Sequence, residues 1–245
     1  MPELTLTDTD RWLLACSSAL AGGFVRGFSG FGGPAVMSLL LTLFYSPLSV
    51  LPKLMLIDSV AQLQLLPSAY SEVDWKVCGT LSIASLVGIP IGSYLLVVTE
   101  PWVIRQCIAA LVTICTLALL TGWRFKAEPG RAWQLAIGFV AGVAVGATFI
   151  ALVAVVYFLA TPARAVTARA GIIYWGFFTG IVMIGLHVAL ANITWSDAWR
   201  SFAVGVIYLL GAVAGTRVFR LSGERDFRRV VMWLLVTLSA AVLMA

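Results

Sequence analysis

The sequence predicts an all-α polytopic membrane protein made of two inverted repeats, each a glycine-broken hairpin of short helices followed by three transmembrane helices. Three observations predict this fold. Of the 245 residues, 61% are hydrophobic and 11% are charged, whereas soluble domains carry about 25% charged residues. Five stretches lack Asp, Glu, Lys and Arg. Such stretches indicate membrane spans, because ~20 apolar residues are needed to cross the ~30 Å of a bilayer core. They are 27–52, 77–99, 106–123, 132–163 and 170–196. The third observation is an internal repeat.

The repeat is visible as ordered matches between the two halves. Gly23-Phe24-Val25, followed by Gly27, recurs from Gly138 at an offset of 115, and Ser46-Pro47 matches Thr161-Pro162 at the same offset. Later matches have an offset of 123: Gly88 with Gly211, Gly92 with Gly215, and Arg105 with Arg228. One glycine pair would mean little, because small residues are common where membrane helices pack. Matches in order across both halves predict a duplication.

The elements follow in the same order in each half. Residues 1–122 form the first repeat, with a hairpin at 12–45 and spans at 50–69, 77–98 and 102–122. After a cytoplasmic linker at 123–131, the second repeat (132–245) has a hairpin at 133–160 and spans at 170–191, 199–217 and 229–244. The hairpin stretches must be broken, because 132–163 as one helix would be ~48 Å long. The first can turn within Gly27–Pro34, and the second at Gly142, Gly146 or Thr148.

Positive charges predict the orientation. If each hairpin returns to its starting side, eleven of the 16 Lys and Arg residues lie on one face, four lie on the other, and Arg26 lies inside the first hairpin. The positive-inside rule places the face with eleven in the cytoplasm. Both termini are then outside. Whether the short helices cross fully or re-enter stays open, because both arrangements return the chain to the same side.

Composition excludes several classes of protein. Segments this apolar exclude a cytosolic enzyme, a secreted disulfide scaffold and a nucleic-acid binder. A membrane-embedded enzyme would need a nucleophile, base or metal cluster, and the chain has one histidine. The four cysteines have no ligand-like spacing, so we expect small core residues, with no metal and no cofactor. They are Cys16, Cys78, Cys107 and Cys115.

The candidate site is an anion site at the two turns. Backbone freed at a helix break is tolerated at membrane depth where it lines a cavity, and half-helix N-termini attract anions. We expect Arg26 to bind an anionic head group by forked hydrogen bonds; the alternative is a structural ion pair or snorkelling. Its repeat mate at offset 115 is Ala141, so the site is asymmetric. The other expected ligands are Ser29, Gly30, Phe31, Gly32, Gly33, Gly146 and Thr148.

Further polar residues could assist this site. Asp58 lies inside a span with Gln62 one turn later on the same face, and it is either a proton-coupling carboxylate, a counter-charge to Arg26, or part of a buried pair. Tyr174 and Trp175 are weaker candidates for the cavity lining, since aromatic residues in spans more often pack or anchor the helix. His187 is expected at the interface or in the core.

These residues carry a resemblance to a known family. The run Gly23-Phe24-Val25-Arg26-Gly27-Phe28-Ser29-Gly30-Phe31-Gly32-Gly33-Pro34 resembles the signature of the TauE/SafE sulfite exporters, also called TSUP transporters. Residues 138–146 resemble its second signature, although Ala147 and Thr148 stand where the family has glycines. Over the whole chain, the resemblance implies a multi-pass transporter of the bacterial inner membrane. Its implied cargo is a small sulfur-containing anion, such as sulfite or an organosulfonate like sulfoacetate, moved mainly by export.

The residues and the resemblance together predict a secondary transporter that works by alternating access around a midplane anion site. Its partners would be a small anionic substrate and the lipid bilayer, with possible proton coupling. A passive anion channel or uniporter, or a carrier of a carboxylate anion, remains an alternative. The sequence does not give the anion, the direction, the coupling ion or the oligomeric state.

Overall fold

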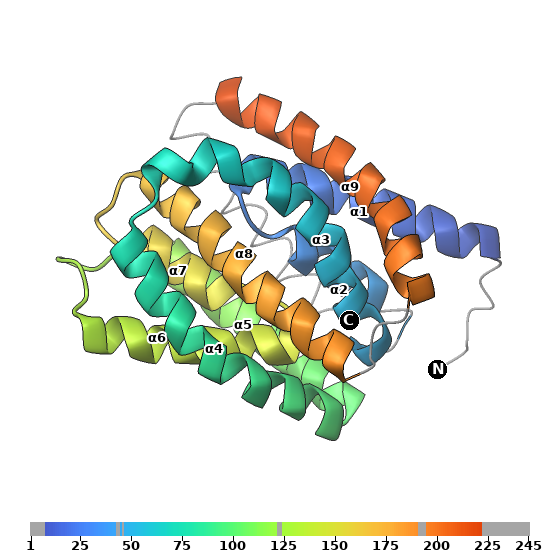
Figure 1. The fold of residues 1–245 in the computed structure, drawn as a ribbon, viewed down its shortest axis with the longest axis horizontal. Helices are drawn as coiled ribbons and strands as arrows, with labels where there is room; N and C mark the ends of the chain where they lie inside the picture. Colours follow the sequence, from blue (N-terminus) through green and yellow to red (C-terminus); the bar gives the residue numbers. More distant parts are fainter. Residues whose placement is uncertain (1–7, 43–44, 46, 122–123, 191–194, 222–245) are drawn as a thin grey trace.

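The computed structural model describes residues 8–42, 45, 47–121, 124–190 and 195–221 (Figure 1). The predicted span at 229–244 lies outside these residues. The described part contains α-helices joined by short connections, one 3-10 turn at Tyr70–Glu72, and no strand. The helices are α1 (Asp8–Ser29), α2 (Gly33–Thr42), α3 (Pro47–Ala69), α4 (Trp75–Val98), α5 (Pro101–Leu120), α6 (Arg131–Thr148), α7 (Leu152–Ala160), α8 (Ala165–Ala189) and α9 (Trp195–Leu221).

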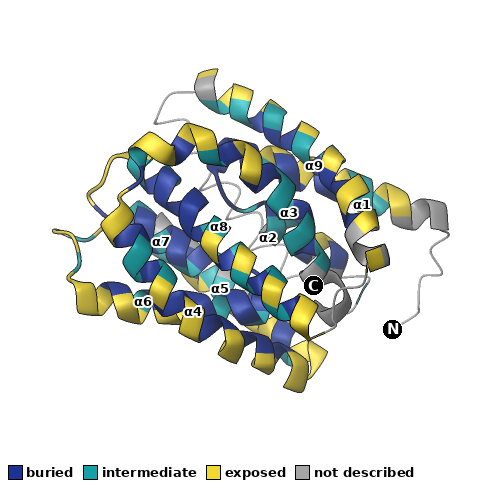
Figure 2. Ribbon diagram, viewed as in Figure 1, coloured by how far each residue is buried: buried dark blue, intermediate teal, exposed yellow. Residues whose placement is uncertain are grey.

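This arrangement confirms the predicted all-α polytopic membrane fold. By length and composition, four segments of the described residues can cross a bilayer: Trp75–Val98, Arg131–Thr148, Ala165–Ala189 and Ser201–Phe219. Large apolar side chains such as Ile83, Val87 and Tyr94 point outward from α4, and exposed residues follow the outer faces of α4, α6 and α9 (Figure 2). An apolar exterior of this kind suits lipid rather than water.

Two helix pairs lie in close contact at opposite edges of the fold (Figure 1). At one edge α4 packs on α6, and at the other α1 packs on α9. Glycines make both contacts possible. A Cβ on Gly88 would overlap the Phe139 carbonyl oxygen on α6, and a Cβ on Gly211 would overlap the Leu20 carbonyl oxygen on α1. Backbones that approach this closely leave no room for a side chain between them.

Each hairpin has one long arm and one short arm, which differs from the predicted pair of short helices. α1 has 22 residues and α2 has 10, while α6 has 18 and α7 has 9. At 1.5 Å per residue, the short arms are only about 15 Å long, half the thickness of a bilayer core. The long arms are held by their glycine faces against α9 and α4, which explains why they extend so far.

The two helix breaks are built alike. At the first, the Ser29 hydroxyl donates to the Val25 carbonyl 2.7 Å away and accepts from the Phe31 N–H, and Gly30 has a φ of 81°. At the second, the Thr148 hydroxyl donates to the Ala144 carbonyl 2.7 Å away and accepts from the Ile150 N–H, and Phe149 has a φ of 59°. A left-handed residue after a helix satisfies its last carbonyl groups and turns the chain.

The second break comes at Thr148, one of the three positions where the sequence allowed a turn. α6 continues through Gly142 and Gly146, whose faces pack on Ser85 and Ile89 of α4, and it ends only at Thr148. These glycines therefore serve close packing, and the turn follows them. Because Ser29 and Thr148 play the same part, the two hairpins align one helical turn away from the offset of 115. The residue in the place of Arg26 is then Val145 and not Ala141.

Candidate functional site

A small cavity lies where the two helix breaks meet. Its volume is about 40 Å³, and one water needs ~10–15 Å³ measured in this way, so it can hold about three waters or one small ion. The first break contributes Phe31, Gly32 and Pro34, and the second contributes the residues from Phe149 to Leu152. The remaining walls come from α1, α3, α6, α7 and α8. The cavity therefore joins the two halves of the chain.

Arg26 is the cation of this cavity. Its side chain lies in the last turn of α1, and the residue is 4% exposed. Nη1 donates to the Gly30 carbonyl oxygen 2.9 Å away, which caps the C-terminal end of α1. Nε lies 3.1 Å from Asp58 Oδ1 without the alignment of a hydrogen bond. Among the described residues, Nη2 makes no hydrogen bond, so both of its N–H groups are left for a ligand.

Asp58 is the other charged residue of the cavity lining. It belongs to α3, and its side chain is 14% exposed. The same oxygen that faces Arg26 accepts a hydrogen bond of 2.5 Å from the Tyr208 hydroxyl of α9. Three helices that are far apart in sequence are thus joined through one carboxylate oxygen. The pair cancels two charges that would each be costly in an apolar interior.

Glycines bring the break close to these groups. A Cβ on Gly33 would overlap the Tyr208 hydroxyl and lie 2.8 Å from Arg26 Cβ, so a glycine is needed where α2 begins. Gly32 has a φ of 82° and lines the cavity. α2 and α7 both start at the cavity wall, and the N-terminal end of a helix carries partial positive charge. Arg26 and two helix ends therefore present positive charge to the same small volume.

A second compartment adjoins the cavity between α3 and α8. Its volume is about 210 Å³, and it shares Met55, Asp58 and Gly176 with the central cavity. Gln62 lies on its wall, is 4% exposed, and donates from Nε2 to the Ile173 carbonyl oxygen at 3.3 Å. The compartment reaches the molecular surface beside the exposed Leu63 and Ile181. We call it the outer compartment.

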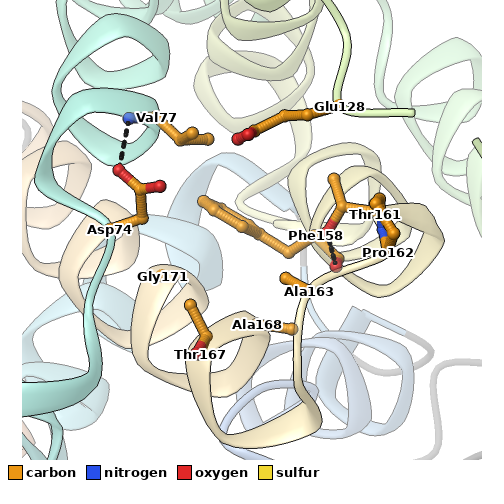
Figure 3. Close-up of a pocket in the computed structure, with 10 residues that line it drawn as sticks. All are labelled: Asp74, Val77, Glu128, Phe158, Thr161, Pro162, Ala163, Thr167, Ala168 and Gly171. Carbon is orange, nitrogen blue, oxygen red and sulfur yellow. Dashed lines mark hydrogen bonds between the residues drawn. The ribbon is translucent and has the colours of Figure 1, made fainter.

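A third cavity of about 230 Å³ lies near the start of α4 and the α7–α8 junction (Figure 3). Asp74 caps α4 there, accepting from Lys76 N–H at 3.0 Å and Val77 N–H at 3.2 Å. The charged groups of its lining are Asp74 and Glu128, and Figure 3 shows the Phe158 ring pointing toward Asp74. Two carboxylates repel an anion, so charge favours the smaller cavity beside Arg26 as the anion site.

The structure brings some of the predicted residues together. Arg26, Phe31, Gly32 and Asp58 line the central cavity, and Gln62 lines the outer compartment. Gly33, the first residue of α2, is not in the cavity lining, although its neighbours Gly32 and Pro34 are. Ser29 and Gly30 lie at the break itself: the single proton of the Ser29 hydroxyl is shared between the Val25 and Phe31 carbonyls, and the Gly30 carbonyl accepts from Arg26.

Other predicted residues lie away from the cavity. Gly146 packs on Ile89 of α4, and the Thr148 hydroxyl is used within the second break. The Tyr174 hydroxyl donates to the Leu66 carbonyl oxygen, and the Trp175 indole donates to Ser85 Oγ at 3.0 Å. His187 is buried against the Phe149 ring, 5.3 Å between ring centroids.

The structure adds residues that the sequence pattern did not identify. Tyr208 holds Asp58, Gly176 separates the two compartments, and Thr179 lines the central cavity. Arg169 donates from Nη2 to the Gly27 carbonyl oxygen at 3.3 Å, and its Cγ lies 2.9 Å from where a Cβ on Gly30 would stand. Tyrosines, threonines and glycines are common in apolar spans, so no sequence signal distinguishes these.

The arrangement can bind and neutralise a small anion. It offers a guanidinium, two helix N-termini and a carboxylate counter-charge inside a space of a few waters. Within the described residues no group of three His, Cys, Asp or Glu side chains could hold a metal ion.

Comparison with known proteins gives one match. The family model described as "Sulfite exporter TauE/SafE" matches residues 14–242. No curated protein and no solved structure matches the chain.

Proposed function

Because the chain belongs to the TauE/SafE sulfite exporter family, we propose that it is a secondary transporter that exports small sulfur-containing anions across the bacterial inner membrane. The family and the apolar helices make it a multi-pass membrane transporter of the anion-exporter type. The anion, the direction of transport and the cycle are the proposal. Sulfite and short organosulfonates are the proposed substrates.

One observation supports this proposal above the others: a buried arginine faces a cavity formed by both helix breaks. Arg26 is held by Gly30 and Asp58, so its guanidinium is oriented before a ligand arrives. Pre-oriented donors lose little freedom when an anion binds. Two oxygens of a sulfite or sulfonate group can also accept the two parallel N–H groups of a guanidinium at once. Nη2 is the nitrogen assigned to the substrate.

The size of the cavity favours a compact head group. About 40 Å³ is room for about three waters, which suits a pyramidal or tetrahedral oxyanion in this conformation. A longer carbon chain must extend elsewhere, and the neighbouring outer compartment offers the space. A cavity enclosed by both breaks also fits a carrier better than a channel, because a channel needs a continuous pore.

In the proposed cycle the two repeats alternate around this site. Asp58 neutralises Arg26 while the site is empty, and it is the carboxylate in the cavity that could carry a proton. When an anion binds at Nη2, the positive helix ends and Arg26 share its charge. Each hairpin then moves as a rigid unit together with the helix packed on its glycines, and this movement opens the site to the opposite face of the membrane.

A binding and flux experiment tests the proposal. Purified protein in a Tris buffer, free of sulfonate buffers, is titrated with sulfite, methanesulfonate, sulfate and acetate while its thermal unfolding is followed. A bound anion raises the unfolding temperature by mass action. We expect sulfite or methanesulfonate to stabilise the wild type, and proteoliposomes to show saturable sulfite flux.

Two variants locate the site. Arg26→Ala should abolish both the stabilisation and the flux. Arg164→Ala is the matched control, because Arg164 has a side chain 79% exposed and only a distant contact with Glu72, and it should behave like the wild type. Unchanged affinity in Arg26→Ala would remove Arg26 from the site. Flux that rises linearly with concentration would indicate a channel, and no response to any anion would contradict the transport proposal.

A further inference from the structure

Gln62 carries a buried acceptor that nothing in the described part of the chain uses. The residue is 4% exposed, and Nε2 donates to the Ile173 carbonyl oxygen at 3.3 Å. A carbonyl oxygen only accepts, so this contact fixes which end of the amide is nitrogen. Oε1 therefore faces away from Ile173, and it has no partner among the described residues. Buried polar atoms without a partner are rare in proteins and call for an explanation.

The surroundings of Gln62 offer acceptors rather than donors. The outer compartment, of about 210 Å³, has three polar side chains on its wall: Asp58, Ser59 and Gln62. The Ser59 hydroxyl donates its proton to the Leu56 carbonyl oxygen at 2.7 Å, which leaves oxygen lone pairs for a ligand. Asp58 contributes a carboxylate. A group that enters this compartment is therefore recognised best if it donates hydrogen bonds, as a hydroxyl or an ammonium does.

The amide of Gln62 and the guanidinium of Arg26 approach each other where the two compartments adjoin. Gly176 lines both the central cavity and the outer compartment. A Cβ at Gly176 would lie 2.8 Å from Gln62 Nε2 and 3.8 Å from Arg26 Nη2. The amide and the guanidinium thus approach the same point from two sides, and the missing side chain of Gly176 leaves the passage between the compartments open. A molecule with a two-carbon chain is long enough to reach from one to the other.

We propose that the outer compartment is a second subsite, which binds the donor end of a substrate whose anionic end is held by Arg26. The substrate class is a short-chain sulfonate with a hydroxyl or an ammonium group two carbons from sulfur. The hydrogen bond to Gln62 Oε1 selects this class over sulfonates with a plain alkyl chain. The inference rests on the proposed function, because it needs an anion at Arg26.

Three probes of equal length test this subsite. Propane-1-sulfonate, 2-hydroxyethanesulfonate and 2-aminoethanesulfonate differ only in the terminal methyl, hydroxyl or ammonium group. Their affinities for the purified full-length protein are measured by isothermal titration calorimetry in Tris buffer, with sulfite as the reference anion. We expect at least one donor-bearing probe to bind about 5- to 10-fold more tightly than propane-1-sulfonate, the effect of one hydrogen bond.

Matched variants assign the effect to Gln62. Gln62→Met keeps the side-chain length and removes the acceptor, so it should erase the preference for the donor-bearing probes over propane-1-sulfonate. Gln64→Met is the control, since Gln64 is exposed on another face of α3. Gly176→Ala should weaken the two-carbon sulfonates and spare sulfite, because its Cβ narrows the passage.

The outcomes separate the two proposals. Equal affinity of the wild type for all three probes overturns the second subsite while the anion site at Arg26 stands, and this comparison needs no variant to fold. A preference that survives in Gln62→Met overturns the role of Gln62. Failure of sulfite and of every sulfonate to bind the wild type overturns both the subsite and the proposed function.

Discussion

Arg26 and Asp58 form an ion pair that joins α1 to α3 at the wall of the central cavity, with Nε 3.1 Å from Oδ1. The two residues are 32 positions apart in the sequence, so their contact forms only in the folded chain. Tyr208 adds a hydrogen bond from α9 to the same oxygen. We therefore assign the pair two roles: it joins α1 to α3, and it orients the guanidinium for an anion.

Breaking this pair from one side should destabilise the protein strongly. Removing one partner of a buried ion pair costs about 3–5 kcal/mol, because the other charge remains unpaired. We expect Arg26→Met and Asp58→Asn each to lower the free energy of unfolding by about 3 kcal/mol or more. The double variant should recover much of that loss, as both charges are then gone. Unfolding in detergent, followed by circular dichroism, measures the three values. Strictly additive losses would contradict the coupling between the two residues.

The glycine contacts between helices predict a difference between two alanine substitutions in α4. Gly88→Ala would push a methyl group onto the Phe139 carbonyl and 2.8 Å from the Val143 nitrogen, and overpacking of this kind costs about 1–3 kcal/mol. Gly79→Ala meets nothing within 4 Å, and alanine favours the helix by up to ~1 kcal/mol. Thermal unfolding of the two variants should therefore shift in opposite directions. A neutral Gly88→Ala would show that α4 and α6 are less closely packed than described.

The charge distribution predicts which face is cytoplasmic, and two exposed positions can test it. Glu128 lies in the predicted cytoplasmic linker, whereas Trp195, 88% exposed, lies at the start of α9 on the opposite face. In a cysteine-free background, a membrane-impermeant maleimide added to intact cells should label Trp195→Cys at once. Glu128→Cys should be labelled only after the cells are opened. The reverse pattern would place both termini in the cytoplasm and would reverse the predicted orientation of the protein in the membrane.

The fold class could be predicted because charge-free runs of this length have few other physical explanations. The first break was also visible, because Gly30 and Gly32 take the positive φ angles for which glycine is suited. The second break could be narrowed only to Gly142, Gly146 or Thr148, and the helix ends at Thr148. Gly142 and Gly146 serve close packing, and the left-handed residue at that turn is Phe149. A glycine in a sequence does not reveal which of these two uses it has.

The candidate site was predictable to a similar degree. Arg26 and Asp58 stand out as charges within apolar runs, so their importance could be inferred before their contact was known. The partners of such residues depend on how distant helices pack. Tyr208 follows Asp58 by 150 positions. The importance of Gly176 is apparent only once the two compartments that it lines are known. Contacts of this kind are set by tertiary structure and leave no local pattern.

The packing of α1 on α9 and of α6 on α4 has a consequence for how the protein is made. Each long arm finds its glycine-faced partner in the other half of the chain, so neither half can complete its packing alone. α1 is synthesised first. At ~5–20 residues per second, translation from Gly27 to Gly211 takes on the order of 10 to 40 s. During that interval the glycine face of α1 lies in the membrane without α9, and other helices can pack against it.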